Sequence, residues 1–461
     1  MATAAIKFTE RTAVVRHRFL ATIFLGSFLL FLVQPMIGRM ALPRLGGAPA
    51  VWNSAMLVYQ ALLLGGYAYA HWLGRFAPRT QARIHLTGFA IAALMLPITL
   101  GAAVPGPQSN IFLWVPWLLA SSIGPLFFII AAQAPLIQRW YTNAGGGDPY
   151  PLYAASNLGS FAGLISYPLL IEPLLPVAAQ SLVWSAGYVG VALLVAWCAL
   201  RLPRGPSQQE TAAKVAAPSR ALVARWIGLA AIPSGLMLST TLYLSTEIIA
   251  MPLLWVVPLG LYLLSFSVAF AEGRFLSILC RRLAPFALVA GSFGVFADTT
   301  GAPWLFALAA LAMLFIVSVA LHAALFDLRP DPSRLTAFYL AMSVGGVIGG
   351  ILCALLAPML FDWTYEHPLL IAATAFALPV AHAAKRPASI GRLTHYGSIL
   401  AVLLSLAGHG AFGLMPSAWM TGLASALLAA LALLAVGQRL LFATLVGALM
   451  LSYSGWARRR G

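Results

Sequence analysis

Long apolar stretches separated by short polar connections run through the whole chain. A transmembrane helix needs about 20 consecutive apolar residues. The pattern therefore predicts a polytopic, all-α membrane protein. We expect spans near 19–37, 50–72, 84–103, 111–137, 151–172, 177–200, 222–245, 250–270, 283–298, 303–326, 335–361 and 366–383. Further apolar runs follow near 395–413, 418–436 and 440–456.

The longest polar interval, residues 201–221, contains three prolines and the run Gln208-Gln209-Glu210, and it predicts a flexible cytoplasmic linker. The predicted organisation is one six-helix membrane half over 1–200, the linker over 201–221, and a second six-helix half over 222–383. Residues 384–461 then add two or three transmembrane helices. The positive-inside rule favours two and the apolar lengths favour three, so 14 or 15 spans stay open.

Two sequence patterns recur in the second half of the chain and suggest that the halves are related. Trp52 and Tyr59 return with the same spacing as Trp255 and Tyr262, 203 positions later (255 − 52). The segment from Tyr153 to Pro173 is echoed by the segment from Tyr339 to Met359, 186 positions later (339 − 153). We interpret these echoes as a parallel internal repeat; the alternative is coincidence among apolar helices of low complexity.

The second pair of repeated segments contains two glycines four residues apart in each half, Gly159 with Gly163 and Gly345 with Gly349. Glycines at this spacing share one helix face and let another helix approach to backbone contact. We therefore predict that all four lie at close helix–helix crossings.

Composition and charge support a membrane protein. Hydrophobic residues make up 61% of the chain and charged residues 8%, with a mean hydropathy of +0.90. The net charge of +16 comes from short basic clusters between apolar segments, and no nucleic-acid motif accompanies them, so we expect no nucleic-acid partner. Threading the loops alternately puts every Lys and Arg except Arg39 and Arg44 on the side of the N-terminus, if the C-terminal tail lies there too. This bias predicts a cytoplasmic N-terminus.

Several blocks between residues 24 and 352 resemble a known family. FLVQPMIGRMALPRLGGAPAVWNSAMLVYQALLLGGYAYAH, DPYPLYAASNLGSFAGLISYPLLIEPLL, STEIIAMPLLWVVPLGLYLLSF and LTAFYLAMSVGGVIGGIL are similar to the membrane domain of the fused major-facilitator/spermidine-synthase proteins of bacteria. The resemblance implies a major-facilitator-like arrangement of the two halves and a place in the bacterial inner membrane. It departs from the family pattern because no soluble synthase-like domain follows before Gly461, and because Ala323 stands after His322 where relatives carry an acidic residue.

The strongest candidates for solute binding are Glu172 and Glu247, at the ends of the fifth and seventh predicted spans. A carboxylate in a bilayer is costly unless it faces a cavity or a partner, although at headgroup depth it is an ordinary residue. Arg39 breaks the positive-inside pattern. It either pairs with one of these carboxylates or extends to lipid phosphate.

Three polar residues inside spans complete the predicted substrate site: Gln34, Asn157 and His322. Gln34 precedes Pro35, and broken helices often line cavities in transporters. His322 is a candidate proton carrier, with a hydrogen-bonded interior histidine as the ordinary alternative. No histidines have metal-ligand spacing and the three cysteines form no CxxC, so we expect no metal, cofactor or disulfide framework.

The sequence therefore favours a carrier for a small solute bound between the halves, in a lipid bilayer. The family association makes a cationic, polyamine-like solute the first expectation. The alternative is a non-transporting membrane subunit that anchors or serves a partner protein. An intramembrane enzyme is a weaker third possibility, since no nucleophile–base pair is found.

Overall fold

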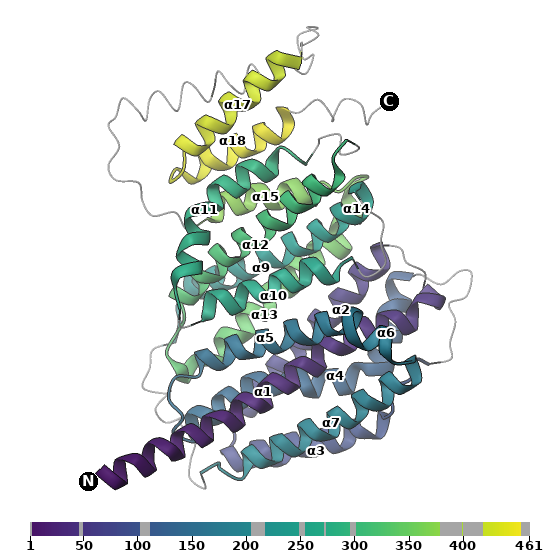
Figure 1. Cartoon of the computed structure of the whole chain (residues 1–461), viewed down its shortest axis with the longest axis vertical. Helices are drawn as coiled ribbons and strands as arrows, with labels where there is room; N and C mark the ends of the chain where they lie inside the picture. Colours follow the sequence, from purple (N-terminus) through teal and green to yellow (C-terminus); the bar gives the residue numbers. More distant parts are fainter. Residues whose placement is uncertain are drawn as a thin grey trace.

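The computed structural model describes residues 2–45, 49–101, 111–203, 217–248, 254–271, 273–295, 301–378, 399 and 418–452. Throughout these ranges the regular structure is helical, with no strand (Figure 1). Eight of the described helical segments are long and apolar enough to cross a membrane. The predicted fold class is confirmed as an all-α polytopic membrane protein, in whose described residues two sets of six helices are followed by further helices. The major-facilitator-like arrangement of the halves stays a prediction.

The first half contains six helices, drawn in purple to blue in Figure 1, and its fifth helix continues through a π turn into a short last turn. These elements are α1 (Ala2–Leu45), α2 (Pro49–Leu73), α3 (Pro78–Ala92) with the 3₁₀ turn η1 (Ala93–Met95), α4 (Ile111–Asn143), α5 (Tyr150–Ser166) with η2 (Tyr167–Ile171) and α6 (Glu172–Leu174), and α7 (Val177–Ala199).

The second half repeats this order, and its fifth helix also continues through a π turn. These elements are α9 (Arg220–Tyr243) with the π turn η3 (Leu244–Ile248), α10 (Val256–Phe270), α11 (Phe275–Ser292), α12 (Pro303–Asp327), the 3₁₀ turn η4 (Pro332–Arg334), α13 (Leu335–Ile351) with η5 (Leu352–Leu356) and α14 (Ala357–Leu360), and α15 (Glu366–Ala377).

The third helix of each half begins earlier than the hydrophobic pattern predicts. We expect spans near 84–103 and 283–298, whereas α3 begins at Pro78 and α11 at Phe275. Both helices open with arginine-bearing turns, which an apolar window excludes although a helix tolerates them at the membrane surface. Proline at the first turn of α3 fits the missing N–H of that position.

The four predicted packing glycines lie at two backbone-to-backbone crossings. A Cβ added to Gly159 or Gly163 would lie within 3.0 Å of a backbone oxygen of α1, that of Phe24 or Phe28. A Cβ on Gly345 or Gly349 would come equally close to the backbone of α9. In each half, therefore, the first and fifth helices touch where side chains are missing.

The crossing partners follow the register of the repeat. Gly159 meets the carbonyl of Phe24, and Gly345 meets that of Ile227, which lies 203 positions after Phe24 (227 − 24). The glycines themselves are 186 positions apart (345 − 159). The two offsets found in the sequence therefore relate the same contact in both halves.

The halves meet through α2 against α13 and α5 against α10 (Figure 1). Beyond the second half, α17 (Ala418–Leu434) and α18 (Arg439–Ser452) pack together and against α11 and α15. They correspond to the apolar runs predicted near 418–436 and 440–456. The run near 395–413, apart from residue 399, and most of the linker 201–221 lie outside the described residues, so the number of appended helices and the domain boundaries stay predictions.

Candidate functional site

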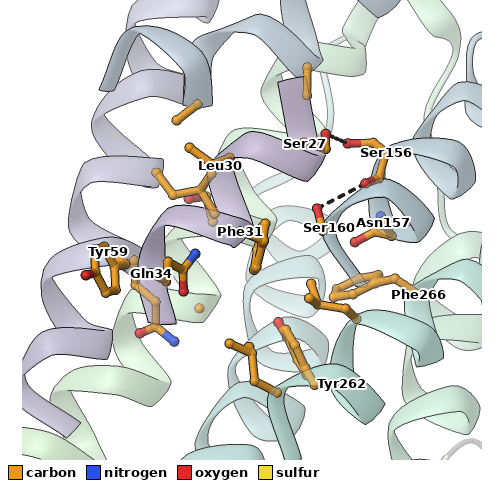
Figure 2. A pocket seen from close by; sticks show the side chains of 18 of the residues that line it. Ser27, Leu30, Phe31, Gln34, Tyr59, Ser156, Asn157, Ser160, Tyr262 and Phe266 are labelled. Carbon is orange, nitrogen blue, oxygen red and sulfur yellow. Dashed lines mark hydrogen bonds between the residues drawn. The ribbon is translucent and has the colours of Figure 1, made fainter. Parts of the chain in front are cut away.

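A central cavity lies between the two halves, and Figure 2 shows part of its lining. It offers about 120 Å³ of room for the centres of water-sized spheres, several times what one water requires. The first half contributes α1, α2, α4 and α5 to its wall, and the second contributes α9, α10 and α13. A cavity shared in this way changes shape whenever the halves move relative to one another.

The repeat places equivalent positions on opposite walls. Met56, Tyr59, Gln60 and Leu63 of α2 correspond at offset 203 to four lining residues of α10, Leu259, Tyr262, Leu263 and Phe266. At offset 186, Ser156, Asn157 and Ser160 of α5 correspond to three lining residues of α13, Met342, Ser343 and Gly346. Phe31 and Gln34 of α1 correspond to Ser234 and Met237 of α9, which also line the cavity.

The first half carries a cluster of small polar side chains on this wall (Figure 2). The hydroxyls of Ser27 and Ser156 are 2.7 Å apart and join α1 to α5. Ser160 donates to the Ser156 carbonyl, and Asn157 donates to the Tyr153 carbonyl, each one turn back along α5. These bonds fix the side chains while leaving the Asn157 amide oxygen as a further acceptor.

A polar chain crosses from one half to the other beside the cavity. Gln60 Nε2 donates to Ser234 Oγ at 3.1 Å, and Ser234 Oγ donates to the Gly346 carbonyl at 3.1 Å. The other amide atom, Gln60 Oε1, is buried without a hydrogen-bond partner, and so is Ser343 Oγ. Buried polar atoms are normally paired. Both residues line the cavity, but these two atoms have almost no accessible surface, so a bound molecule would reach them only after the side chains rearrange.

The lining holds no Asp, Glu, Lys, Arg or His. Its polar groups are hydroxyls and amides, set among aromatic and aliphatic side chains. Such a wall offers hydrogen bonds and apolar contact but no counter-charge. The chemistry suits an uncharged molecule with both polar and apolar faces.

We call the end of the molecule that carries Arg75, Arg139, Arg274 and Arg281 the basic end. Here aromatic rings from the two halves close over the cavity. Tyr153 stacks on Tyr339, its equivalent in the repeat, with centroids 4.7 Å apart, and Tyr67 contacts Tyr339 from α2. The Tyr339 hydroxyl donates to Gln138 of the first half at 2.6 Å.

At the opposite end, which carries Glu172 and Glu247 and which we call the acidic end, a second equivalent pair meets. Trp52 and Trp255, at the starts of α2 and α10, stack with centroids 6.3 Å apart. The cavity thus lies between two inter-half aromatic contacts, each made by residues related by the repeat.

The structure divides the predicted substrate residues into two groups. Gln34 and Asn157 line the cavity. Glu172 lies away from it and forms an ion pair with Arg39, at 2.9 Å between Oε1 and Nε. Glu247 accepts a hydrogen bond from the Trp363 indole at 2.8 Å. The two carboxylates therefore engage protein partners, and their role in solute binding stays a prediction.

His322 lies directly behind the wall formed by Tyr262 and Phe266. Its Nδ1 is 2.8 Å from Ser265 Oγ, and its ring stacks on Phe266 with centroids 3.5 Å apart. Because Ser265 donates its proton to the Tyr262 carbonyl, its oxygen must accept from Nδ1–H. This leaves Nε2 as a buried acceptor without a partner. His322 is thus tied to the wall without lining the cavity.

Sequence reasoning did not select most of the lining. Ser27, Ser156, Ser160, Ser234 and Ser343 are common in membrane helices, and nothing marks them singly. The internal repeat was the sequence feature that could have identified the lining, since Tyr59 and Tyr262 already formed an aligned pair. Within the described residues, no three His, Cys, Asp or Glu side chains gather as a metal site would require.

No protein-family model matches the chain, and no curated protein matches it. Among solved structures, the chain is similar to a D-xylose–proton symporter (12% identity, TM-score 0.49, covering 79% of this chain and 96% of that one). It is also similar to the human organic anion transporter MFSD10 (13%, 0.47, 79% and 94%) and to the E. coli fucose–proton symporter FucP (15%, 0.38, 79% and 100%).

Likeness at this level carries no conclusion about the family or the substrate of this chain. None of these proteins is a fused spermidine-synthase protein, so the membership suggested by the sequence blocks stays a prediction.

Proposed function

We propose that this protein is a membrane carrier for a small, uncharged solute that binds in the central cavity. The observation that carries the proposal is the lining itself: it comes from equivalent positions of both halves, and it combines uncharged polar groups with apolar side chains. A static membrane anchor has no need for such a cavity at its centre.

The lining also favours an uncharged solute over the polyamine-like one expected from the family resemblance. A cation in a cavity without a carboxylate would lose its hydration and gain no counter-charge, which is costly inside a membrane. Glu172 is paired with Arg39 instead of facing the cavity. An uncharged molecule with hydroxyl or amide groups avoids this cost and can hydrogen-bond to the amides and hydroxyls of the lining.

Movement of the solute follows from the two closed ends. In carriers built of two halves, alternating access arises when one half rocks against the other around a central site. We infer that separation of Trp52 from Trp255 opens the acidic end, and that separation of Tyr153 from Tyr339 opens the basic end. Both contacts are between halves, so a rocking motion breaks one while keeping the other.

Within this proposal, Gln34, Gln60 and Asn157 contact the solute directly. The Arg39–Glu172 pair and Glu247 act at the acidic mouth, and His322 supports the wall from behind. The N-terminus lies in the cytoplasm, as the basic loops predict, and the membrane is the bacterial inner membrane. No specific observation favours the alternative of a subunit that serves a partner protein.

Purified protein in proteoliposomes tests the proposal with three solutes of one shape: D-glucose, the cation D-glucosamine and the anion D-glucuronate, with spermidine as a further cation. We expect any uptake above that of empty liposomes to favour the neutral sugar. A panel of other neutral polyols and amphiphiles extends the search. Selective uptake of spermidine or glucosamine would overturn the assignment of an uncharged solute.

Gln60→Leu should abolish the uptake that is found, because it removes the polar chain between the halves. Gln438→Leu makes the same exchange at an exposed position between α17 and α18 and should leave uptake unchanged. Equal uptake by both variants would place the solute elsewhere.

A further inference from the structure

A small polar pocket lies at the basic end, on the junction between the halves and apart from the central cavity. Arg139, Thr142 and Asn143 at the end of α4 form one side of it. The other side comes from the second half, with Ser333 of η4 and Thr336 of α13. About 20 Å³ of room remains for the centre of a water-sized sphere, enough for one oxygen atom of a ligand.

Positive charge gathers around this pocket. Arg75, Arg139 and Arg334 all lie close enough to act on the ring of His71, and His71 itself bonds to Thr336 across the junction at 2.9 Å. Arg139 donates from Nη2 to the Gly74 carbonyl at 2.8 Å. Among the ion pairs of the described residues, none involves Arg139.

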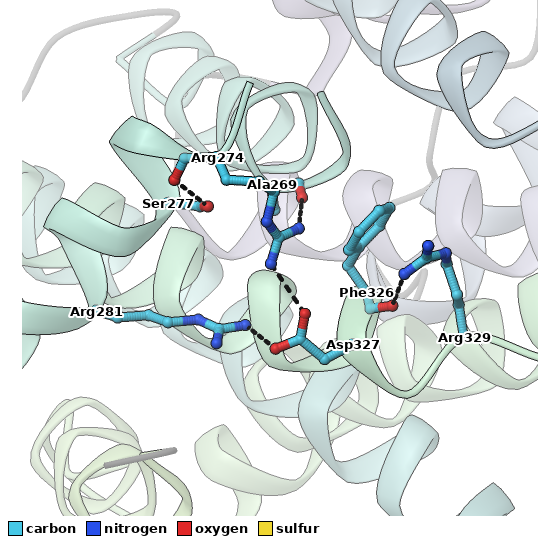
Figure 3. Close-up of polar contacts among 7 residues, drawn as sticks. All are labelled: Ala269, Arg274, Ser277, Arg281, Phe326, Asp327 and Arg329. Atoms are coloured by element: carbon cyan, nitrogen blue, oxygen red, sulfur yellow. Dashed lines mark hydrogen bonds and ion pairs between the residues drawn. The ribbon is translucent and has the colours of Figure 1, made fainter. Parts of the chain in front are cut away.

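The corresponding place in the second half shows what is missing. At the end of α12, the fourth helix of that half, Asp327 binds Arg274 at 2.9 Å and also pairs with Arg281 (Figure 3). The second half thus supplies its own anion to the basic loop. In the first half α4 ends at Asn143, and Arg139, one turn earlier, forms none of the ion pairs found among the described residues.

One donor in the pocket lacks a partner. Asn143 Nδ2 is buried and makes no hydrogen bond within the described structure, whereas the Ser333 hydroxyl is directed to the Asp331 carboxylate. The nearest acid in sequence, Asp331, is exposed, does not line the pocket and accepts from the Ser333 backbone N–H at 2.9 Å. Hydrogen bonds from Ser333 lower the pKa of Asp331. The Arg139 guanidinium and the free amide N–H of Asn143, beside one oxygen-sized space, are donors of the kind that phosphate oxygens prefer.

We propose that this pocket binds a phosphate-type anion, which inserts one oxygen between α4 and η4 while the rest of the group stays at the membrane surface. The anion supplies negative charge to the first half, as Asp327 does to Arg274 and Arg281 of the second half. Because the pocket lining comes from both halves, binding holds the basic end closed. The site itself does not depend on the proposed carrier function; only its effect on opening does.

The phosphate can belong to a lipid headgroup or be free in solution. Basic pockets at the membrane surface bind anionic headgroups. Thermal unfolding of the full chain, followed by tryptophan fluorescence, separates the two sources. One arm adds inorganic phosphate to protein in neutral detergent, against chloride at equal ionic strength. The other compares nanodiscs of phosphatidylcholine with nanodiscs that also contain phosphatidylglycerol.

We expect a higher melting temperature in at least one arm. A rise with inorganic phosphate identifies free anion, and a rise only with phosphatidylglycerol identifies the headgroup. Arg139→Gln should weaken the apparent affinity roughly tenfold, because it removes a charge-assisted contact. Arg79→Gln, in the same basic region but bonded to the Leu202 carbonyl, should respond like the parent.

Arg139→Gln also loses the bond to Gly74, so Asn143→Ala provides the independent test. Asn143 Nδ2 has no protein partner, and its removal should weaken the anion response while leaving the melting temperature without anion unchanged. The proposal is overturned if neither arm raises the melting temperature, or if Asn143→Ala responds like the parent. Failure of the carrier assay alone leaves this result unaffected.

Discussion

The two walls of the central cavity occupy equivalent positions in the repeat but differ in chemistry. The wall of the first half is the more polar, and at four of the equivalent positions the second half has an apolar residue or glycine. These pairs are Gln34 and Met237, Gln60 and Leu263, Ser156 and Met342, and Ser160 and Gly346. Tyr59 and Tyr262 are the same on both sides.

The packing contacts, unlike the cavity walls, keep the same residue types in both halves. The glycine crossings, the tyrosine stack and the tryptophan stack are made by the same residue types in both halves. The difference is consistent with two tasks in the proposed carrier: matched residues hold and close the fold, while unmatched residues would distinguish one face of a solute from the other. We therefore expect the first half to recognise the polar groups and the second half to contact the apolar face.

The largest effect should come from filling a matched crossing. Gly163→Leu or Gly349→Leu would drive a side chain into the backbone of α1 or α9 and should lower the free energy of unfolding by more than about 3 kcal/mol. Thermal unfolding and the yield of monodisperse protein measure this. Gly190→Leu is the control, since a Cβ there meets nothing within 4 Å. Unchanged stability in Gly349→Leu would contradict the crossing.

The next effect concerns the unmatched pair Gln60 and Leu263. Gln60→Leu makes both walls alike and leaves Ser234 without its donor, so solute affinity should fall about tenfold to a hundredfold. Leu263→Gln places the amide on the opposite wall and should not restore binding in the double variant. Calorimetry with the solute found in the uptake screen measures both. Full binding by the double variant would show that the two walls are interchangeable.

A smaller effect should follow from Asn157→Ser, which gives the first half the residue of its equivalent Ser343. The shorter side chain keeps a hydroxyl but loses reach, and we expect affinity to fall by about fivefold, within the range of one hydrogen bond. Ser121→Ala, at an exposed position on α4, is the control in the same binding assay. Equal affinities for Asn157→Ser and the parent would remove Asn157 from the recognising face.

The smallest effect on stability should come from the pair outside the walls. Arg39 and Glu172 are 45% and 30% exposed, and an exposed ion pair contributes about 0–1 kcal/mol. Glu172→Gln should therefore change the melting temperature little. The effect of Glu172→Gln on solute affinity shows whether the acidic mouth belongs to the binding site together with the two walls. A large loss of affinity would extend the site to the acidic mouth, as the sequence predicts, and would count against a site confined to the two walls.

Much of the fold could be predicted because apolar length, glycine spacing and loop charge act locally. The matched offsets of Trp52 and Tyr153 already indicated two related halves. The site was harder. Gln34 and Asn157 stand out as amides in apolar helices, and both line the cavity. Glu172 and Glu247 stand out more strongly because charge is rare in this chain, yet the structure gives them protein partners.

The serines that form the polar wall could not be identified one by one. A serine in a membrane helix bonds to its own backbone as readily as to a ligand, so only its place beside the cavity distinguishes it. The early starts of α3 and α11 were missed because arginines at a membrane surface look like loop residues in sequence.

The central claim is that the halves rock around the cavity, and distances across its two ends test it most directly. Spin labels replace Arg79 and Arg282 at the basic end, or Leu174 and Met359 at the acidic end, after Cys198, Cys280 and Cys353 are changed to alanine. Pulsed dipolar spectroscopy in nanodiscs then gives the distance distribution for each pair. A carrier whose halves rock should show two populations at each end, and conditions that lengthen the distance at one end should shorten it at the other. A single narrow distribution at both ends, unchanged by any solute that binds, would contradict a carrier.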